Sequence, residues 1–496
     1  MMPNMEIDAD LASIQQARDL IRKAKAAQER LAGFSQVEVD RICAAMAKAG
    51  YEHAADLARQ AVDETKMGRF EDKILKNQFA TQTVWEAIKD LRTVGVIADH
   101  PDRGITEVGV PMGVIAAIIP TTNPTSTAMF KSIIAVKAGN AIIVSPHPSA
   151  RHCTMAAVRL MAEAGEAAGL PEGTISCLEV PTMEAVNTLM KHRDVALILA
   201  TGGGAMVKAA YSSGTPAIGV GPGNGPAYIE RTADIPAAVR RILDSKTFDN
   251  GTICASEQSV VTEDVIKDQV VAEFTRQGAY FLNSTEKEAV GAILMRASGT
   301  MNPAIVGQTA ERVAQLAGIT VPAGTRVLIG YETEVGDRYP YSKEKLCPVL
   351  GFYSTPDWHS ACELSIKILL HEGAGHTMSI HSRDESVIKE FALKKPVSRL
   401  LVNTPAALGG VGATTDLVPS LTLGCGAVGG NSSSDNIGPL NLINIRRVAR
   451  GRRELGELRP AGEVTAAVGG PGTPAADIDT ERLVRLVVEQ LLKAAR

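Results

Sequence analysis

The sequence predicts an α/β protein with a doubly wound, nucleotide-binding domain and a second α/β domain. Short, almost continuously aliphatic runs alternate with helical segments through the first half of the chain, a pattern typical of parallel sheets covered by helices on both faces. The chain has 496 residues, more than one hydrophobic core usually covers. Its 45 glycines and 4% aromatic content suit a protein built on small and aliphatic side chains.

Charge and hydropathy argue against several classes of function. The net charge is −4 and no block of basic residues stands out, so nucleic-acid binding is not expected. The acidic, polar residues 1–10 do not form a secretory or transit signal, and the longest apolar run, 108–120, is too short to cross a membrane. The seven cysteines are scattered without a C-x-x-C pair, which predicts reduced thiols and a cytoplasmic location.

The first half of the chain is expected to begin with helices and to continue as a strand–helix alternation. Apolar residues at helical spacing predict several amphipathic helices over 11–50 and 54–89. The strands expected next span 105–110, 114–119, 141–144, 175–180 and 195–200, with helices over 126–136, 153–165 and 183–192. The glycines of 201–204 then open a further helix. Such an alternation indicates a doubly wound sheet.

The second half repeats the alternation less regularly. Strands are expected at 327–329, 349–353 and 399–403, and helices at 263–277, 309–317, 358–370 and 384–393. The Gly/Ser/Thr-rich segment 404–439 is too long for a simple connection, so it is predicted to be functional or to form an interface. A strand over 440–448 and a Pro/Gly/Ala linker over 456–476 follow, and residues 477–496 form a separate tail.

Cys254 is the candidate nucleophile. It lies between the turn-prone segment 249–251 and the polar segment 256–258, whereas a structural cysteine usually has aliphatic neighbours. After a glycine turn a thiol is accessible, and backbone N–H groups are free to face a bound oxygen. Local chemistry alone leaves a plain loop cysteine as an open alternative.

Three glycine-rich stretches are candidate ligand-binding loops. The stretch 201–207 follows an apolar strand and opens a helix, so its backbone can approach a pyrophosphate at the helix N-terminus. It is neither a complete G-x-G-x-x-G nor a Walker motif, and a simple tight turn remains open. The stretch 219–226 lines a ligand channel or is merely a loop, and 408–416 is more typical of a surface loop.

No metal site is predicted. His371 and His376 are five residues apart rather than four, and the glycines between them argue against the helix that a zinc motif requires. Among the carboxylates, Glu257 and Glu344 stand out by position, although a lone glutamate is usually solvated surface.

Six long motifs occur together and in order. They are VGVPMGVIAAIIPTTNPTSTAMFK, AVKAGNAIIVSPHPSA, ATGGGAMVKAAYSSGTPAIGVGPGNGP, FDNGTICASEQS, EKLCPVL and HEGAGHTMSIHS. Over about residues 11–450 the chain resembles the aldehyde dehydrogenase superfamily. Within it, the motifs resemble the CoA-acylating acetaldehyde and propionaldehyde dehydrogenases, including the aldehyde dehydrogenase half of bifunctional aldehyde–alcohol dehydrogenases.

The resemblance implies roles for individual residues. Cys254 matches the nucleophile, and Asn123 matches the amide that forms the oxyanion hole with the Cys254 backbone N–H. His376 falls where this branch has a histidine near the active site, and its role is left open. The residues implied in cofactor binding are Thr121, Ser145, His147, Pro148, Thr201, Gly202, Gly203, Gly204, Gly219, Val220, Gly221 and Glu344, of which Glu344 matches the carboxylate on the nicotinamide-side ribose. NAD is implied as the cofactor; NADP is not excluded, because Arg151 follows 145–148 closely.

One departure from the superfamily pattern bears on the reaction. Hydrolytic aldehyde dehydrogenases carry a glutamate in an E-L-G-G motif, and the matching stretch here begins at Gly219. Without that base water attacks slowly, so the resemblance implies that the acyl group passes to coenzyme A. The implied substrate is propanal or ethanal. The alternatives are a hydrolytic enzyme, or an acylating enzyme for an anionic aldehyde such as sulfoacetaldehyde or succinate semialdehyde.

Two further classes are disfavoured. A histidinol-dehydrogenase-like zinc enzyme would need clustered ligands that the sequence does not show. A non-enzymatic scaffold on a dead dehydrogenase fold would be expected to lack Cys254 or Asn123, and both are present.

The domain boundaries follow from the same resemblance. Residues 1–238 are expected to bind NAD and CoA, with arm strands at about 98–115, 239–430 to form the catalytic domain, and 431–450 the oligomerisation strand of a homodimer or dimer of dimers. After a linker over 451–476, the tail 477–496 reads as an amphipathic helix that resembles encapsulation peptides. It predicts a place inside a bacterial microcompartment with a shell or core partner. Packing on its own oligomer is one alternative; binding to a membrane surface is disfavoured, because the polar face mixes Glu with Arg.

Overall fold

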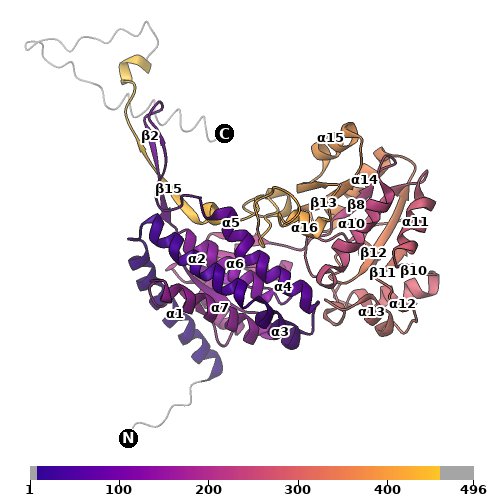
Figure 1. The fold of residues 1–496 in the computed structure, drawn as a ribbon, viewed down its shortest axis with the longest axis horizontal. Coiled ribbons are helices and arrows are strands. Elements are labelled where there is room, and N and C mark those ends of the chain that lie inside the picture. Colours follow the sequence, from indigo (N-terminus) through magenta and orange to yellow (C-terminus); the bar gives the residue numbers. More distant parts are fainter. Residues whose placement is uncertain (1–7, 459–496) are drawn as a thin grey trace, which may run out of the picture. The chain divides into compact units, whose positions relative to one another are not determined.

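The structure, a computed structural model, describes residues 8–458. Contacts divide the chain into two units: Met1–Asp99 with Thr106–Val448, and His100–Ile105 with Ala449–Arg496. The larger unit contains a five-stranded and a seven-stranded sheet (Figure 1). This arrangement confirms the predicted α/β class with parallel sheets. The tail 477–496 and most of the linker lie outside the described residues.

Helices open the chain, as predicted. They are α1 (Ala9–Leu31), α2 (Gln36–Glu52), α3 (Ala54–Thr65), α4 (Phe70–Gln78) and α5 (Val84–Ile88), with a π-helical turn, η1 (Phe79–Thr83), between the last two. Ser35 caps α2 in a capping box: its hydroxyl accepts from the Glu38 N–H and the Glu38 carboxylate accepts from the Ser35 N–H. Such a pair satisfies two N–H groups that a helix start leaves open.

The five-stranded sheet is parallel and has the order β5-β4-β3-β6-β7. Its strands are β3 (Val114–Ile118), β4 (Ala141–Ser145), β5 (Ile175–Cys177), β6 (Val195–Thr201) and β7 (Ala217–Val220). The helices that follow its strands are α6 (Pro124–Lys137), α7 (Arg151–Ala167), α8 (Met183–Lys191) and α9 (Gly204–Tyr211). The sequence predicts all of these except β7, and it extends β5 three residues too far.

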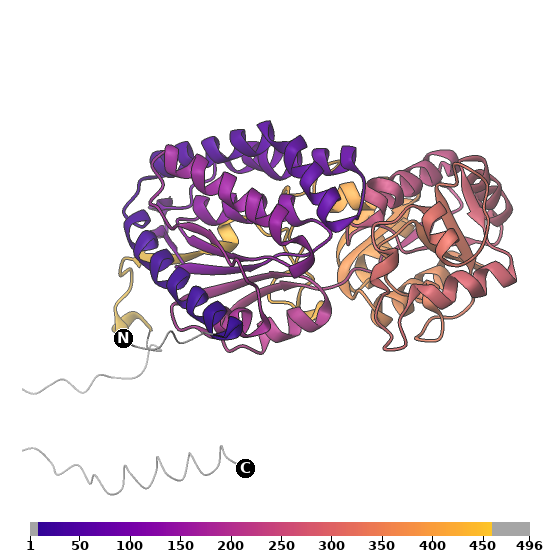
Figure 2. The same cartoon turned by 90° about the horizontal axis from the view of Figure 1, so that it is seen from below.

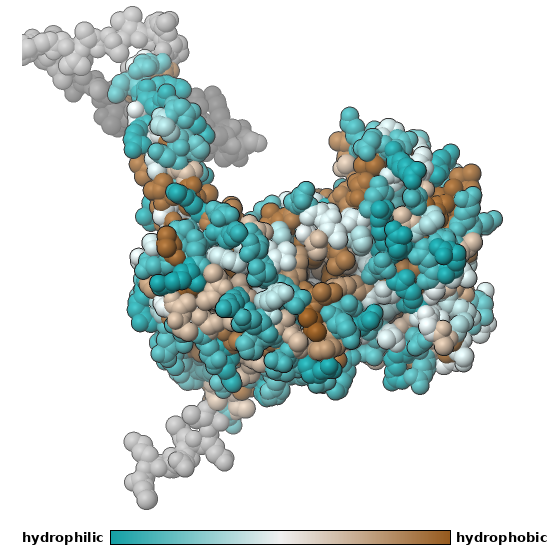
Figure 3. All heavy atoms as spheres, viewed as in Figure 1, coloured by the Kyte–Doolittle hydropathy of each residue, from teal (hydrophilic) through white to brown (hydrophobic). Residues whose placement is uncertain are grey.

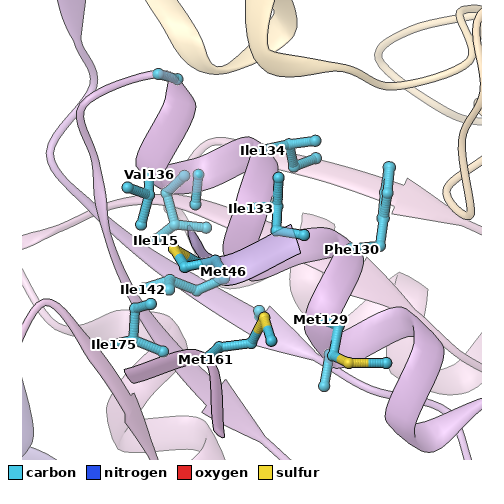
Figure 4. Packing of buried hydrophobic residues seen from close by; sticks show 14 of the residues in the cluster. Met46, Ile115, Met129, Phe130, Ile133, Ile134, Val136, Ile142, Met161 and Ile175 are labelled. Carbon is cyan, nitrogen blue, oxygen red and sulfur yellow. The ribbon is translucent and has the colours of Figure 1, made fainter. Parts of the chain in front are cut away.

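Alternate residues of the central strand β3 enter two different cores. Ile115 and Ala117 pack with α2, α6 and α7, while Val114 and Ala116 pack with α1 and α8. All five residues of β3 are buried, as expected for a strand covered on both faces. Figure 2 shows the sheet edge-on between its helical layers, and Figure 4 shows the first core around Ile115, Met46 and Phe130.

The seven-stranded sheet is also parallel, in the order β10-β11-β12-β9-β8-β13-β14. Its strands are β8 (Pro226–Ile229), β9 (Ser259–Glu263), β10 (Ala279–Phe281), β11 (Val327–Tyr331), β12 (Val349–Thr355), β13 (Gly375–His381) and β14 (Val397–Val402). The helices of this half are α10 (Ile235–Thr247), α11 (Lys267–Arg276), α12 (Ser284–Leu294), α13 (Ala310–Leu316), α14 (Trp358–His371), α15 (Glu385–Lys394) and α16 (Ala406–Gly410).

Several expectations for this half need correction. The helix predicted over 263–277 begins only at Lys267, because Glu263 ends the buried strand β9. The sequence does not predict the strands β8, β9, β10 and β13 or the helices α10, α12 and α16. Because β8 belongs to the second sheet, the chain changes sheets between residues 220 and 226, ahead of the expected boundary at 238.

A third sheet has the order β1-β2-β15, with β1 (Gly95–His100), β2 (Ile105–Pro111) and β15 (Ile443–Ala449). The expected strand over 440–448 starts later, because residues Pro439–Leu442 form a 3₁₀ turn. β15 is exposed from its second residue onward and is an edge strand. In Figure 3 the side chains on this arm are mainly hydrophilic.

Candidate active site

The carboxyl ends of four neighbouring strands bring most of the predicted site residues to one edge of the five-stranded sheet. Thr121 and Asn123 follow β3, and the segment 145–148 begins at the end of β4. Thr201 ends β6 beside Val220 of β7. The carboxyl edge of an open parallel sheet is where such folds bind ligands, at the point where the strand order reverses. Here the reversal lies at β3, which has β4 on one side and β6 on the other.

The glycines of 201–204 leave open space at this edge. Gly203 caps α9, and a Cβ atom added at Gly203 or Gly204 would meet nothing of the chain within 4 Å. Packing within the chain therefore does not require glycine here. The exposed backbone at this helix N-terminus is accessible to a group that approaches it closely, such as a phosphate.

The turn after β4 borders a surface cavity of about 480 Å³. Its lining includes Pro148, Arg151, His152 and Glu64. The His147 Nδ1 atom accepts a hydrogen bond from the Ser149 N–H at 3.1 Å, which fixes the turn. The Glu64 carboxylate accepts from the first N–H groups of α7, at His152 (2.9 Å) and Cys153 (2.7 Å). The Glu64 side chain therefore supplies the acceptors for these N–H groups at the start of the helix.

A left-handed turn precedes the candidate nucleophile. Asp249, Asn250 and Gly251 have φ angles of 48°, 53° and 76°. Asparagine, aspartate and glycine are the residues that adopt this conformation most readily. The Asn250 side chain donates to the Gly307 carbonyl at 2.9 Å, and Asp249 is fully buried. The turn that the sequence predicts at 249–251 is thus held by tertiary contacts.

Cys254 and His376 form the chemical centre. The His376 Nε2 atom lies 3.2 Å from the Cys254 Sγ atom, although the residues are 122 positions apart. Burial, with smaller contributions from Glu344 and Cys425, raises the pKa of Cys254 to about 12. Burial and the Arg399 guanidinium lower the pKa of His376 to about 3. At neutral pH the free protein therefore holds a neutral thiol beside a neutral imidazole.

Two residues that the sequence analysis did not single out hold the imidazole. The His376 Nδ1 atom lies 3.0 Å from the Thr377 hydroxyl, which accepts a hydrogen bond from Arg399 Nε at 3.2 Å. The Arg399 guanidinium also donates to the carbonyls of Gly424 and Ser434. Arg399 thereby ties the predicted functional segment 404–439 to the strand that carries His376. Arg399 differs from the other arginines that the structure describes in its burial and its contacts, and neither can be recognised from the sequence.

The Asn123 amide lies beside the chain segment that leads to Cys254. Its Nδ2 atom donates to the Thr252 carbonyl at 3.2 Å and to the Thr122 hydroxyl at 3.1 Å. Both distances are longer than the usual 2.9–3.0 Å of an N–H···O bond. The Cys254 N–H faces its own sulfur and lowers the pKa of that thiol slightly. The Asn123 Nδ2 atom thus contacts residue 252, two positions before Cys254, and both of its hydrogens have acceptors within the chain.

At position 219, where hydrolytic aldehyde dehydrogenases have their glutamate, neighbouring side chains fill the space that a side chain would need. Gly219 is buried near the end of β7, and a Cβ atom there would come within 2.7 Å of Val207 Cγ1 and 2.9 Å of Tyr211 Cε2. The Tyr211 hydroxyl accepts hydrogen bonds from the Gly219 N–H (2.9 Å) and the Ser432 N–H (3.0 Å). A side chain at 219 would have to displace this ring.

Glu344 lies close to the thiol. Its Oε1 atom accepts from the Gly223 N–H at 2.8 Å, and its own N–H donates to Glu372 at 2.7 Å. Burial, together with the Glu372 carboxylate, raises the pKa of Glu344 to about 8. Gly223 packs directly on the Cys254 carbonyl: a Cβ at 223 would lie 2.0 Å from that oxygen. This contact is the reason for glycine at one position of 219–226.

The second carboxylate noted in the sequence, Glu257, has a structural contact. It is buried and accepts from the Ala406 N–H at 2.9 Å, at the start of α16. Burial raises its pKa to about 7.

His371 ends α14, whereas His376 lies in β13. Within residues 8–458 no group of three or more His, Cys, Asp or Glu is arranged to hold a metal ion, and no helix there is long and apolar enough to cross a membrane.

Comparisons with known proteins agree with this geometry. The family model described as "Aldehyde dehydrogenase family" matches residues 6–343. The bifunctional aldehyde-alcohol dehydrogenase AdhE of Escherichia coli is 46% identical over 445 residues, 89% of this chain and 50% of that protein. The chain thus spans about half the length of the curated relatives that head the comparison.

Solved structures include counterparts of similar length. An acetylating aldehyde dehydrogenase from Geobacillus thermoglucosidasius is 52% identical with a TM-score of 0.89, covering 90% of this chain and 99% of that one. Propionaldehyde dehydrogenase from Rhodopseudomonas palustris, solved with bound CoA and an acylated cysteine, is 27% identical with a TM-score of 0.79, covering 88% and 97%. With the fold, the cysteine centre and the matched model in agreement, the chain belongs to the aldehyde dehydrogenase family.

Proposed function

We propose that the protein is a CoA-acylating aldehyde dehydrogenase that converts a short-chain aldehyde, a nicotinamide dinucleotide and CoA to acyl-CoA, the reduced dinucleotide and a proton. The observation that carries the proposal is the pairing of Cys254 with His376 in a chain whose residue 219 is a glycine packed against Val207 and Tyr211. A nucleophile is present, and the position of a water-activating carboxylate is occupied by Tyr211.

The chemistry begins at the Cys254 sulfur. The Cys254 thiol releases its proton to solvent, and the sulfur then bonds to the aldehyde carbon. The His376 Nε2 atom contacts this sulfur at 3.2 Å and orients it, but with a pKa lowered to about 3 the imidazole does not retain the proton. The carbonyl oxygen becomes an oxyanion, which the Cys254 N–H and the Asn123 amide are placed to stabilise. As the C=O bond re-forms, the carbon gives up hydride and a thioester remains on Cys254. The bound dinucleotide supplies the hydride acceptor.

The acyl group then leaves on a thiol. The CoA sulfur attacks the thioester carbon, and Cys254 departs as the leaving thiolate. Exchange of one thioester for another is close to balanced, so the reaction runs in both directions. Water competes poorly, because residue 219 is a glycine and supplies no carboxylate where hydrolytic relatives have their glutamate, and Val207 and Tyr211 fill the adjoining space.

The open edge of the five-stranded sheet is the proposed dinucleotide site. Gly203 and Gly204 admit a pyrophosphate, Ser145 to Pro148 lie where an adenosine would extend, and Glu344 lies nearer to Cys254, toward the nicotinamide side. We propose NAD as the preferred cofactor. The Glu64 carboxylate at the start of α7 disfavours the added phosphate of NADP, although Arg151 lies next to it.

Propanal and ethanal are the proposed substrates. An anionic aldehyde would need a free cation near Cys254. The cation whose charge acts on Cys254 is Arg399, and its guanidinium already donates to Thr377, Gly424, Ser434 and Asn436. It is 4% exposed. A neutral aldehyde therefore fits the site better.

Assembly and location remain proposals from the sequence. The exposed edge strand β15 is available for pairing with a second copy, which supports a homodimer or a dimer of dimers. Targeting to a bacterial microcompartment depends on the tail 477–496, outside the described residues.

The test is reduced-dinucleotide formation from propanal and NAD, with and without CoA, and with a Cys254→Ala variant as control. Strong dependence on CoA, with propanoyl-CoA as product and no activity in the variant, is the expected result. Equal rates with and without CoA, giving propanoate, would refute the acylating assignment.

A further inference from the structure

A buried lysine connects the oxyanion amide to the nucleophile segment. Lys76, on α4, is 5% exposed and far from Cys254 in the sequence. Its ammonium group lies 2.5 Å from Asn123 Oδ1, 2.5 Å from Asp249 Oδ2 and 2.9 Å from Thr252 Oγ1. All three hydrogens of the ammonium group therefore have an acceptor.

These acceptors belong to the two halves of the site. Asn123 follows β3 of the five-stranded sheet, whereas Asp249 and Thr252 lie in the turn that leads to Cys254. Asp249 is fully buried and is also paired with Lys73 at 3.0 Å. Burial lowers the pKa of Lys76 to about 8, while Asp249 opposes the shift. Burying the Lys76 ammonium group carries a large desolvation penalty, so packing alone does not account for a lysine at this position.

The contact with Asn123 decides which end of the amide faces the nucleophile segment. An asparagine amide has an accepting oxygen at one end and a donating nitrogen at the other, with similar shapes. A positively charged donor on Oδ1 excludes the flipped orientation. With Oδ1 held by Lys76, Nδ2 points to the Thr252 carbonyl, two residues before Cys254.

We propose that Lys76 is a positioning residue for the reaction at Cys254: it holds Asn123 Oδ1, so that the Nδ2 end of the amide, which donates to Thr122 and Thr252 in the free protein, is oriented to exchange one of these bonds for a bond to the oxyanion. The inference rests on the proposed function, because it takes Asn123 as an oxyanion donor. Lys76 does not touch the substrate. It acts through the amide and through the turn that it shares with Asp249 and Thr252.

Lys73 provides a matched control on the same helix. It is also buried and contacts the same Asp249 oxygen, but its other acceptor is the Thr122 carbonyl rather than the Asn123 side chain. Lys73→Met and Lys76→Met each remove one partner of Asp249. Only Lys76→Met frees the amide.

The experiment measures first-turnover NADH formation and thermal melting for Lys76→Met, Lys73→Met, Asn123→Ala and the Lys76→Met/Asn123→Ala double variant. Removing an oxyanion donor costs about 10²–10³ in rate, which is the loss expected for Asn123→Ala. Because the donor remains but is misoriented, Lys76→Met should lose about 10–100-fold in rate with little change in the KM for propanal. Lys73→Met should lose less than about 3-fold, since it leaves the amide in place.

The double variant separates orientation from general stability. If Lys76 acts through the amide, its removal should cost less than about 3-fold once Asn123 is already alanine. Losses that multiply, or a Lys76→Met variant with near-normal rate, would overturn the proposal. If Lys76→Met shows no cooperative melt, Lys76→Met/Asp249→Asn replaces it under the same criteria, with Asp249→Asn as its control, because the second change removes the buried carboxylate that Lys76 neutralises.

Failure of the proposed function would show separately, in the wild-type protein. If wild type forms propanoate without CoA, the acylating assignment fails. The Lys76 comparison then continues on that reaction, because the thioester on Cys254 precedes both products.

Discussion

A side chain introduced at Gly219 tests the proposal that the acyl group passes to a thiol rather than to water. The perturbation is Gly219→Glu, which supplies the carboxylate found in hydrolytic relatives of the family. The structure predicts that this residue does not fit: its Cβ alone approaches Val207 Cγ1 to 2.7 Å and Tyr211 Cε2 to 2.9 Å. We therefore expect a destabilised protein that still does not hydrolyse its thioester.

The magnitude follows from overpacking. Forcing extra atoms into a packed region costs about 1–3 kcal/mol, and each kcal/mol lowers the Tm of a domain of this size by roughly 2–4 °C. The Tm should fall by about 2–12 °C in Gly219→Ala as well as in Gly219→Glu. Gly221→Ala is the control for melting, because a Cβ there meets nothing within 4 Å.

The assay follows both products from propanal at limiting CoA. Propanoyl-CoA should remain the main product of Gly219→Glu, whereas the double variant Gly219→Glu/Tyr211→Ala, which opens the space, should form more propanoate. A Gly219→Glu variant with an unchanged Tm that produces propanoate as fast as propanoyl-CoA would refute the packing argument.

Three further predictions concern the thiol and its neighbours. Alkylation of Cys254 by iodoacetamide in the free protein should rise about tenfold per pH unit from pH 7 to beyond 9, because its pKa is raised to about 12; a plateau near pH 9 would show an ordinary thiol. Bound NAD, whose nicotinamide is cationic, should accelerate that alkylation, and unchanged labelling would contradict a nicotinamide site near the sulfur. Stability should decrease as the pH falls below 6.5, because His376 and His381 have pKa values lowered to about 3 and the unfolded chain binds their protons; urea melts of a His381→Gln variant should show a weaker dependence between pH 6.5 and 4.

The features of the site that can be predicted from the sequence are those that depend on a few consecutive residues. The apolar runs of β3, β4 and β6 are short and continuous, and the polar or glycine-rich residues that follow them mark the sheet edge. The left-handed turn before Cys254 is visible as Asp-Asn-Gly. These features depend on neighbours in the chain, so a pattern of a few residues is enough to find them.

Contacts between distant segments could not be predicted in this way. Lys76 and Asp249 are 173 positions apart, and nothing near Lys76 separates it from the other basic residues of an amphipathic helix. Thr377 and Arg399 gain their roles only when β13 and β14 pair. The strand β8 begins with a proline and is four residues long, so its local signal is weak.

The Tyr211 ring also bears on how the two chemistries of this family separate in evolution. Two of the four glycine codons, GGA and GGG, become glutamate codons by a single nucleotide change, so the genetic distance from glycine to a water-activating residue is small. The Tyr211 ring packs against Gly219, and its hydroxyl accepts hydrogen bonds from the Gly219 and Ser432 N–H groups, so a glutamate at 219 does not fit without a further structural change. A lineage that regained hydrolysis would have to lose the ring first, or tolerate a destabilised intermediate. Because a Cβ atom at 219 also meets Val207, more than one substitution is expected to separate this chain from a hydrolytic relative.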